Sequence, residues 1–320
     1  MNVQAALDQL ATYRSQNTRA SQDIFEKGAL VLEKNVVHKM GDECWGFLEQ
    51  LALAAIDVGR LDVADVRTCY SRIERLRSPT SRRRQECLRT LNAKFPGSPR
   101  VDCLTGIRME ATEAPDIALK YYAELLEADP THAAVWKRRI SIFRRTGKID
   151  KAVHELSQYL DTFYTDVEGW LELADIYATS NQYEYSLQSL EHVLLLAPQN
   201  PFYVLQAAET GYTAGDLALA IKMFLMVVDM TDGDDSESLV ESTPLGITVR
   251  AWYGVKLCTR RMAQDARLAT SSRSNTPPPK NVKMLDELAT ERLRVAYSSS
   301  GKKGEIAKGR EEVFAWVAAH

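Results

Sequence analysis

The sequence predicts an all-α solenoid, a right-handed superhelix of helix–turn–helix repeats that is closed by C-terminal capping helices. The first observation is one pattern that occurs twice between Ala133 and Asn200, with a constant interval between equivalent positions. The aligned pairs are Trp136 with Trp170, Phe143 with Tyr177, Ala152 with Ser186, and Leu156 with Leu190. The second is the spacing i, i+3, i+4, i+7 of Trp170, Leu173, Ala174 and Tyr177, which forms one face of a helix. No sustained alternation of apolar and polar residues predicts a strand.

The interval, about 34 residues, is the period of the tetratricopeptide repeat, a unit of two helices. Two weaker copies extend the register, so we expect four repeats over residues 99–232. We expect the aromatic residues of the register to anchor neighbouring helices rather than to form a cofactor site. These structural anchors are Trp136, Phe143, Trp170, Tyr177 and Phe224. Trp136 and Trp170 are expected to be mostly buried.

The flanking segments depart from this register. We expect residues 1–41 to form an irregular N-terminal extension that contains short helical patterns, for example Ala5-Leu10 and Ile24-Leu32. We expect residues 42–98 to form a divergent first repeat with an inserted basic helix that starts at Ser78-Pro79. Residues 233–320 are expected to hold an acidic loop, C-terminal helices and a flexible linker around Pro277-Pro278-Pro279. The last helix carries Phe314 and Trp316, which predicts that it docks back and caps the solenoid.

The inserted segment is rich in arginine and includes Arg82, Arg83 and Arg84 as a possible basic surface. One interpretation is a solvated face that keeps an inserted helix soluble. The other is a basic patch that meets an acidic protein partner or anionic lipid headgroups. The sequence does not decide between them.

Composition restricts the class of protein. The 320 residues hold 40 Lys and Arg against 43 Asp and Glu, a net charge of −3, which argues against nucleic acid as the main partner. No apolar run reaches the roughly 18 residues of a membrane helix, and residues 1–20 lack the apolar core of a secretory signal. The five cysteines are scattered, as expected of free thiols in a reducing compartment. Together these features favour a cytosolic protein.

The sequence contains no catalytic motif of the common hydrolase, metalloprotease or nucleotide-binding types. The five histidines lack the spacing of metal ligands. Gly147, in a short run that resembles a phosphate loop, falls where a repeat turns between its helices. We therefore expect no enzyme activity, no cofactor, no metal and no small-molecule ligand.

What remains is a protein-binding groove, because the first helix of each repeat lines the concave face of such a solenoid. The expected groove residues are Arg100, Cys103, Ile107, Lys137, Ser141, Arg144, Leu171, Asp175, Phe202, Leu205 and Glu209. Co-chaperone repeats of this type clamp a terminal carboxylate with paired asparagines, but Ser141 and Asp175 stand at those positions. The mixed basic, apolar and acidic lining fits a protein segment better than a small ligand.

Several short runs are more specific than the repeat pattern. They are Phe95-Pro96-Gly97-Ser98, Leu104-Thr105-Gly106-Ile107-Arg108, Glu127-Ala128-Asp129-Pro130-Thr131, Lys137-Arg138-Arg139-Ile140 and Glu168-Gly169-Trp170. In this order they resemble the family of subunit 2 of the ER membrane protein complex, over about residues 44–230. The resemblance implies a non-catalytic scaffold at the cytoplasmic face of the endoplasmic reticulum membrane, where the complex inserts tail-anchored and multi-pass proteins.

The resemblance also implies the partners. These are the cytosolic subunit of the 8 or 9 type and the cytosolic parts of membrane subunits 3 and 5, so membrane contact is indirect. Two alternatives remain open. One is a soluble co-chaperone or adaptor that binds protein tails. The other is a regulatory repeat domain that captures a soluble enzyme.

Overall fold

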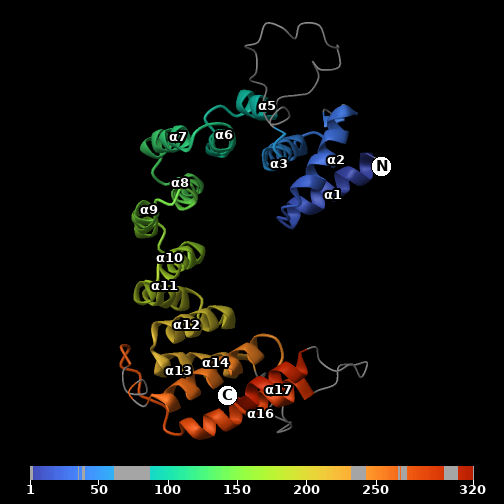
Figure 1. Cartoon of the computed structure of the whole chain (residues 1–320). Helices are drawn as coiled ribbons and strands as arrows, with labels where there is room; N and C mark the ends of the chain where they lie inside the picture. The colour runs from blue at the N-terminus through green and yellow to red at the C-terminus, as the bar shows by residue number, and fades with distance from the viewer. Residues whose placement is uncertain are drawn as a thin grey trace. The chain divides into compact units, whose positions relative to one another are not determined.

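The computed structural model describes residues 3–34, 36–37, 40–60, 87–231, 243–265, 267, 272–298 and 309–319. Every regular element in these ranges is a helix, and none of them contains a strand (Figure 1). The chain divides into two compact units, Met1–Glu155 and Leu156–His320, with the boundary inside α9 (Ile149–Thr162). The predicted all-α, tetratricopeptide-type fold is confirmed.

The repeat register sets the helix positions. The first helices of the four repeats begin at one constant interval: α6 (Pro99–Thr112), α8 (Ala133–Arg145), α10 (Val167–Thr179) and α12 (Pro201–Ala214). Their partner helices keep the same interval: α7 (Pro115–Ala128), α9, α11 (Tyr183–Leu196) and α13 (Leu217–Thr231). Within three of the repeats, the first helix lies against its partner: α6 against α7, α10 against α11, and α12 against α13 (Figure 1).

Local sequence explains where these helices begin and end. Proline stands in the first turn of α6, α7 and α12, where its missing N–H has no helical partner to lose. Asn200 caps α12, since its Oδ1 accepts a hydrogen bond from the Phe202 backbone N–H at 3.0 Å. Gly147 and Gly215 follow α8 and α12 with φ of 72° and 87°, a left-handed conformation that glycine adopts at low cost.

The tryptophan anchors hold the turns between repeats. Trp136 Nε1 donates to the Pro130 carbonyl and Trp170 Nε1 to the Tyr164 carbonyl, both at 2.9 Å and both six residues back. The two indoles are partly buried, so the expectation that they are mostly buried is met only in part. Their ring edges must stay near the surface, because each N–H reaches a loop carbonyl. Of the other anchors, Phe143 and Phe224 are buried and Tyr177 is partly buried.

The N-terminal segment is not an irregular extension, and that expectation is wrong for residues 3–34. The segment forms α1 (Val3–Ser15) and α2 (Ser21–Glu33), which pack with α3 (Glu43–Asp57) around one core. The pairs Ala6 and Leu10, and Ile24 and Val31, are buried in it. Gly28 lets α2 approach α3 closely, since a Cβ there would lie 2.6 Å from Leu51 Cδ1.

Of the segment expected to form an inserted basic helix, the structure describes only the residues from Cys87 onward. Residues 87–94 form α5 (Cys87–Lys94), with Leu88 and Leu91 buried in the core that holds α1–α3. Arg82, Arg83 and Arg84 and most of the predicted acidic loop lie outside the described residues.

The C-terminal helices close the second unit. α14 (Ile247–Gln264) packs on α13, and α16 (Val282–Ser298) packs on α14, with α17 (Arg310–Ala319) against α16. Val317 of α17 is buried in the same core as Phe224 and Trp252. The segment before the three prolines contacts the second unit at Asp216 and Glu184. Ser274 donates from N and Oγ to Asp216 Oδ2 at 3.1 and 2.7 Å, Ser272 Oγ donates to the same oxygen at 3.0 Å, and Arg273 pairs with Glu184.

Candidate protein-binding surface

The expected groove residues of the first unit lie on α6 and α8. Arg100 is exposed and its Nη2 donates to both carboxylate oxygens of Glu49 on α3, at 2.9 and 2.7 Å. Ser141 is exposed, whereas Lys137, Arg144 and Ile107 are partly buried. Cys103 is buried, so its expected place on the groove surface is wrong. Arg100 therefore faces α3, a helix that the repeat register did not connect with it.

In the second unit, the expected groove residues separate into two kinds. Phe202 keeps 65% of its surface exposed and Asp175 is exposed, while Leu171 is partly buried. Leu205 is only 5% exposed and lies in the core shared by α12, α13 and α14, so its expected groove position is wrong.

Glu209 joins α12 to α14. Its Oε1 accepts from Arg250 Nε at 2.5 Å and its Oε2 accepts from Arg250 Nη2 at 2.9 Å. Both side chains are partly exposed, so this ion pair contributes little to stability. The described groove residues of this unit therefore include an exposed aromatic ring, an exposed acid and a second acid that is already paired with arginine.

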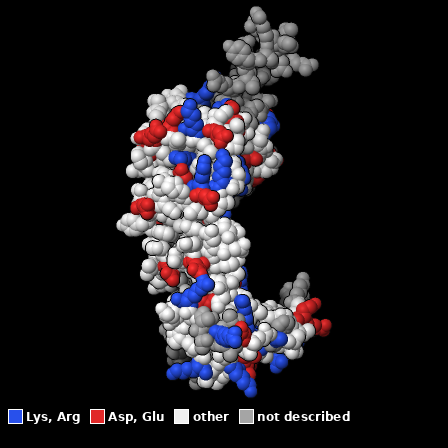
Figure 2. All heavy atoms as spheres, turned by 60° about the vertical axis from the view of Figure 1, so that its left-hand side comes forward, with Lys and Arg blue, Asp and Glu red and all other residues white. Residues whose placement is uncertain are grey.

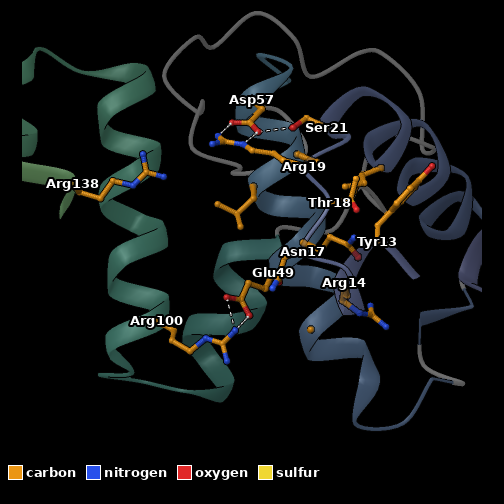
Figure 3. Close-up of a pocket in the computed structure, with 15 residues that line it drawn as sticks. Tyr13, Arg14, Asn17, Thr18, Arg19, Ser21, Glu49, Asp57, Arg100 and Arg138 are labelled. Atoms are coloured by element: carbon orange, nitrogen blue, oxygen red, sulfur yellow. Dashed lines mark hydrogen bonds and ion pairs between the residues drawn. The ribbon is translucent and has the colours of Figure 1, made fainter. Parts of the chain in front are cut away.

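A pocket in the first unit has a more definite geometry. It encloses about 440 Å³ and is lined by residues of α1, the α1–α2 turn, α2, α3, α6 and α8 (Figure 3). The lining residues are Tyr13, Arg14, Asn17, Thr18, Arg19, Ser21, Ile24, Gly46, Glu49, Gln50, Leu53, Ala54, Asp57, Arg100 and Arg138. Four of them are arginines and two are carboxylates, an excess of two positive charges in a chain of net charge −3.

Two ion pairs build the wall of this pocket. Arg19 donates from Nε and Nη2 to the two oxygens of Asp57, at 2.9 and 2.7 Å, and Ser21 Oγ donates to Asp57 Oδ2 at 2.6 Å. The Arg19 guanidinium holds the pKa of Asp57 below its ordinary value; burial opposes this shift and the Ser21 hydroxyl adds to it. These contacts fasten the α1–α2 turn to the end of α3. The second wall pair is Arg100 with Glu49.

The other two arginines are less closely engaged. Arg138 Nη1 lies 4.0 Å from Glu110 Oε2, and Glu110 also accepts the Tyr122 hydroxyl at 2.7 Å. Arg14 Nη2 lies 3.9 Å from the exposed Glu43, and its Nη1 is buried without a hydrogen-bond partner among the described residues. A guanidinium offers five N–H donors, so this wall retains donors for an acceptor brought by a ligand.

The described lining offers guanidinium, carboxylate, hydroxyl and amide groups, and contains neither His nor Cys. Elsewhere in the described ranges no group of His, Cys, Asp and Glu could hold a metal ion. Burial raises the pKa of the Cys87 and Cys258 thiols to about 12, which keeps them protonated and weakly nucleophilic.

This pocket was not predicted from the sequence. The short helical patterns near Ala5-Leu10 and Ile24-Leu32 were visible there, but the packing of these helices on α3 was not. Arg19 and Asp57 are 38 positions apart, and no local sequence pattern predicts a contact over that distance.

The surface and the hydropathy of the described helices add two facts. On the face in Figure 2, the Lys and Arg side chains that are described lie among Asp and Glu rather than in one large basic area. None of the described helices is both long and apolar enough to cross a membrane.

Comparison with known proteins decides the family. Residues 98–218 match the family described as the EMC2 TPR-like repeat domain. The ER membrane protein complex subunit 2 of Xenopus tropicalis is 32% identical over 298 residues, which cover 92% of this chain and 86% of that protein. The chain belongs to the ER membrane protein complex subunit 2 family. A second relative is the TPR repeat protein oca3 of Schizosaccharomyces pombe, 27% identical over 87% of this chain and 89% of that protein.

Solved structures agree on the fold of this family member. The C-terminal part of a TPR repeat-containing protein from Cytophaga hutchinsonii matches 95% of this chain and 98% of its own, with a TM-score of 0.52 and 12% identity. At that identity the likeness concerns the fold alone.

Proposed function

We propose that this chain is a non-catalytic scaffold subunit of an ER membrane protein complex, at the cytoplasmic face of the endoplasmic reticulum membrane. In this role it supports the insertion of tail-anchored and multi-pass proteins. The observation that carries the proposal is 32% identity across 92% of the chain to a protein named as subunit 2 of that complex. A repeat fold supports the same role, because each repeat adds side-chain surface for partners.

The scaffold acts by holding segments of its partner subunits. The proposed partners are a cytosolic subunit of the 8 or 9 type and the cytosolic parts of membrane subunits 3 and 5. Phe202 is an exposed aromatic ring at the start of α12, and Arg144 lies near the end of α8. Aromatic residues and arginine carry most of the energy at protein interfaces, so we propose Arg144 as a main contact of the first unit and Phe202 as a main contact of the second. A stable interface of this kind buries more than about 1,000 Å².

The test combines Arg144→Glu with Phe202→Ala in one tagged variant, expressed in place of the natural chain. We expect normal helicity by circular dichroism, loss of at least one partner subunit from the pull-down, and lower steady-state amounts of tail-anchored proteins. Removing the aromatic ring and reversing the charge should each weaken binding at least tenfold, since interface contacts of this kind contribute about 2 kcal/mol or more.

The matched control combines Arg145→Glu with Leu195→Ala, two exposed positions outside the proposed groove. This control should recover every partner in normal amount. If the folded groove variant also recovers every partner in normal amount, Arg144 and Phe202 are not main contacts, and the partners bind elsewhere on the chain.

A further inference from the structure

The pocket of the first unit combines excess positive charge with apolar surface. Arg19, Arg100 and Arg138 come from the α1–α2 turn, α6 and α8, and surround it on three sides (Figure 3). Ile24, Leu53 and Ala54 supply the apolar part of the lining. A site for one small inorganic anion needs neither this volume nor these apolar side chains. A volume of about 440 Å³ falls in the range of sites that hold an organic ligand rather than a single ion.

The arginines keep capacity for a further anion. Both hydrogen bonds from Arg100 to Glu49 leave from Nη2, and those from Arg19 to Asp57 leave from Nε and Nη2. Arg138 contacts Glu110 only at 4.0 Å, longer than a hydrogen bond. A carboxylate brought into the pocket can therefore form a closer, charge-assisted contact with Arg138 than the one it has.

We propose that this pocket is a docking site for an acidic peptide segment of a partner protein, with a Glu or Asp side chain paired to Arg138 and an apolar neighbour against Ile24 and Leu53. Charge complementarity selects the occupant. The lining holds four arginines and two carboxylates, and the acids nearest to Arg138 and Arg14 lie outside it, at 4.0 and 3.9 Å. Carboxylates are planar anions that one guanidinium can bind through two parallel hydrogen bonds. The inference rests on the proposed scaffold role, because it assigns the pocket to a subunit of the same assembly. It adds a second attachment point, which is lined by α1–α3 together with the repeat helices α6 and α8.

The experiment titrates the purified full chain into three fluorescent eight-residue peptides. Each contains two leucines in a serine and glycine background, together with three glutamates, three glutamines or three lysines. We expect the glutamate peptide to bind at least tenfold more tightly than the other two. Its affinity should fall as the salt concentration rises from about 0.05 to about 0.5 M, because added ions screen partly exposed ion pairs.

Arg138→Gln should weaken binding of the glutamate peptide about tenfold, the loss expected for one charge-assisted contact. Arg145→Gln, an exposed arginine seven positions along the same helix, is the matched control and should leave the affinity unchanged. The reversed variant Arg138→Glu should prefer the lysine peptide. Circular dichroism of each variant checks that the helices are retained.

Equal binding of the glutamate and glutamine peptides, or full affinity in Arg138→Gln, would overturn the inference. Competition by sulfate at the same concentration of negative charge would show a small-anion site instead, and would overturn it as well. The proposed function is judged separately. A chain that recovers its membrane partners but binds no acidic peptide contradicts only the pocket, whereas one that binds the peptide but recovers no membrane partner contradicts only the scaffold role.

Discussion

Tyr122→Ala is expected to lower the free energy of unfolding of the first unit by about 4 kcal/mol, the cost typical of removing a buried aromatic ring. Tyr122 is 0% exposed. Its ring fills the space that Gly106 leaves on α6, where a Cβ would lie 2.1 Å from Tyr122 Cε1. Its hydroxyl donates to Glu110 at 2.7 Å. Truncation would therefore open a cavity and leave the Glu110 carboxylate without this donor.

Urea unfolding followed by circular dichroism measures this effect. Tyr122→Phe keeps the ring and loses only the hydroxyl, so it should cost about 1 kcal/mol. Tyr121→Ala removes the neighbouring, partly buried ring and should cost less than Tyr122→Ala. If Tyr122→Ala unfolds at the midpoint of the unaltered chain, the packing of α7 on α6 is not as described.

Asp286→Ala is expected to destabilise the second unit by about 3 kcal/mol, because it would leave a buried ammonium group without its counter-ion. Lys256 on α14 is 3% exposed, and its Nζ donates to Asp286 Oδ2 at 2.7 Å and to Thr290 Oγ1 at 2.9 Å. Asp286 also accepts from Thr259 Oγ1 at 2.9 Å. This cluster joins α16 to α14, so its loss should release α16 first.

Hydrogen exchange resolved by peptide can locate the effect, with faster exchange expected in α16 and at the α14 surface beneath it. The matched control Glu287→Ala changes the adjacent, exposed acid and should be close to neutral. The double variant Lys256→Met with Asp286→Leu should recover most of the lost stability, since an apolar pair replaces the buried ions. Unchanged exchange in Asp286→Ala would contradict the role of this ion pair.

The repeat register was predictable from sequence because it depends on residues that recur at a fixed interval along the chain. The interval from Trp136 to Trp170 recurs between the starts of the first helices, at Pro99, Ala133, Val167 and Pro201. Proline and glycine at the helix ends make these boundaries readable, since each restricts the backbone in a known way.

The departures from prediction come from contacts between distant residues. α1 and α2 bury their apolar faces in a core that they share with α3, and this packing brings Arg19 to Asp57. Leu205 was placed on the groove by its distance from the repeat start, but its neighbours α13 and α14 bury it. Lys256 and Asp286 are 30 positions apart, and neither residue type at its own position indicates the other.

The most direct test of the scaffold role is a pull-down of the unaltered, tagged chain from detergent-solubilised membranes and, in parallel, from cytosol. We expect membrane-embedded subunits of the ER complex to be recovered from the membrane fraction in amounts close to that of the chain itself. Recovery of chaperones or of one soluble enzyme from cytosol, with no membrane subunit in either fraction, would contradict it.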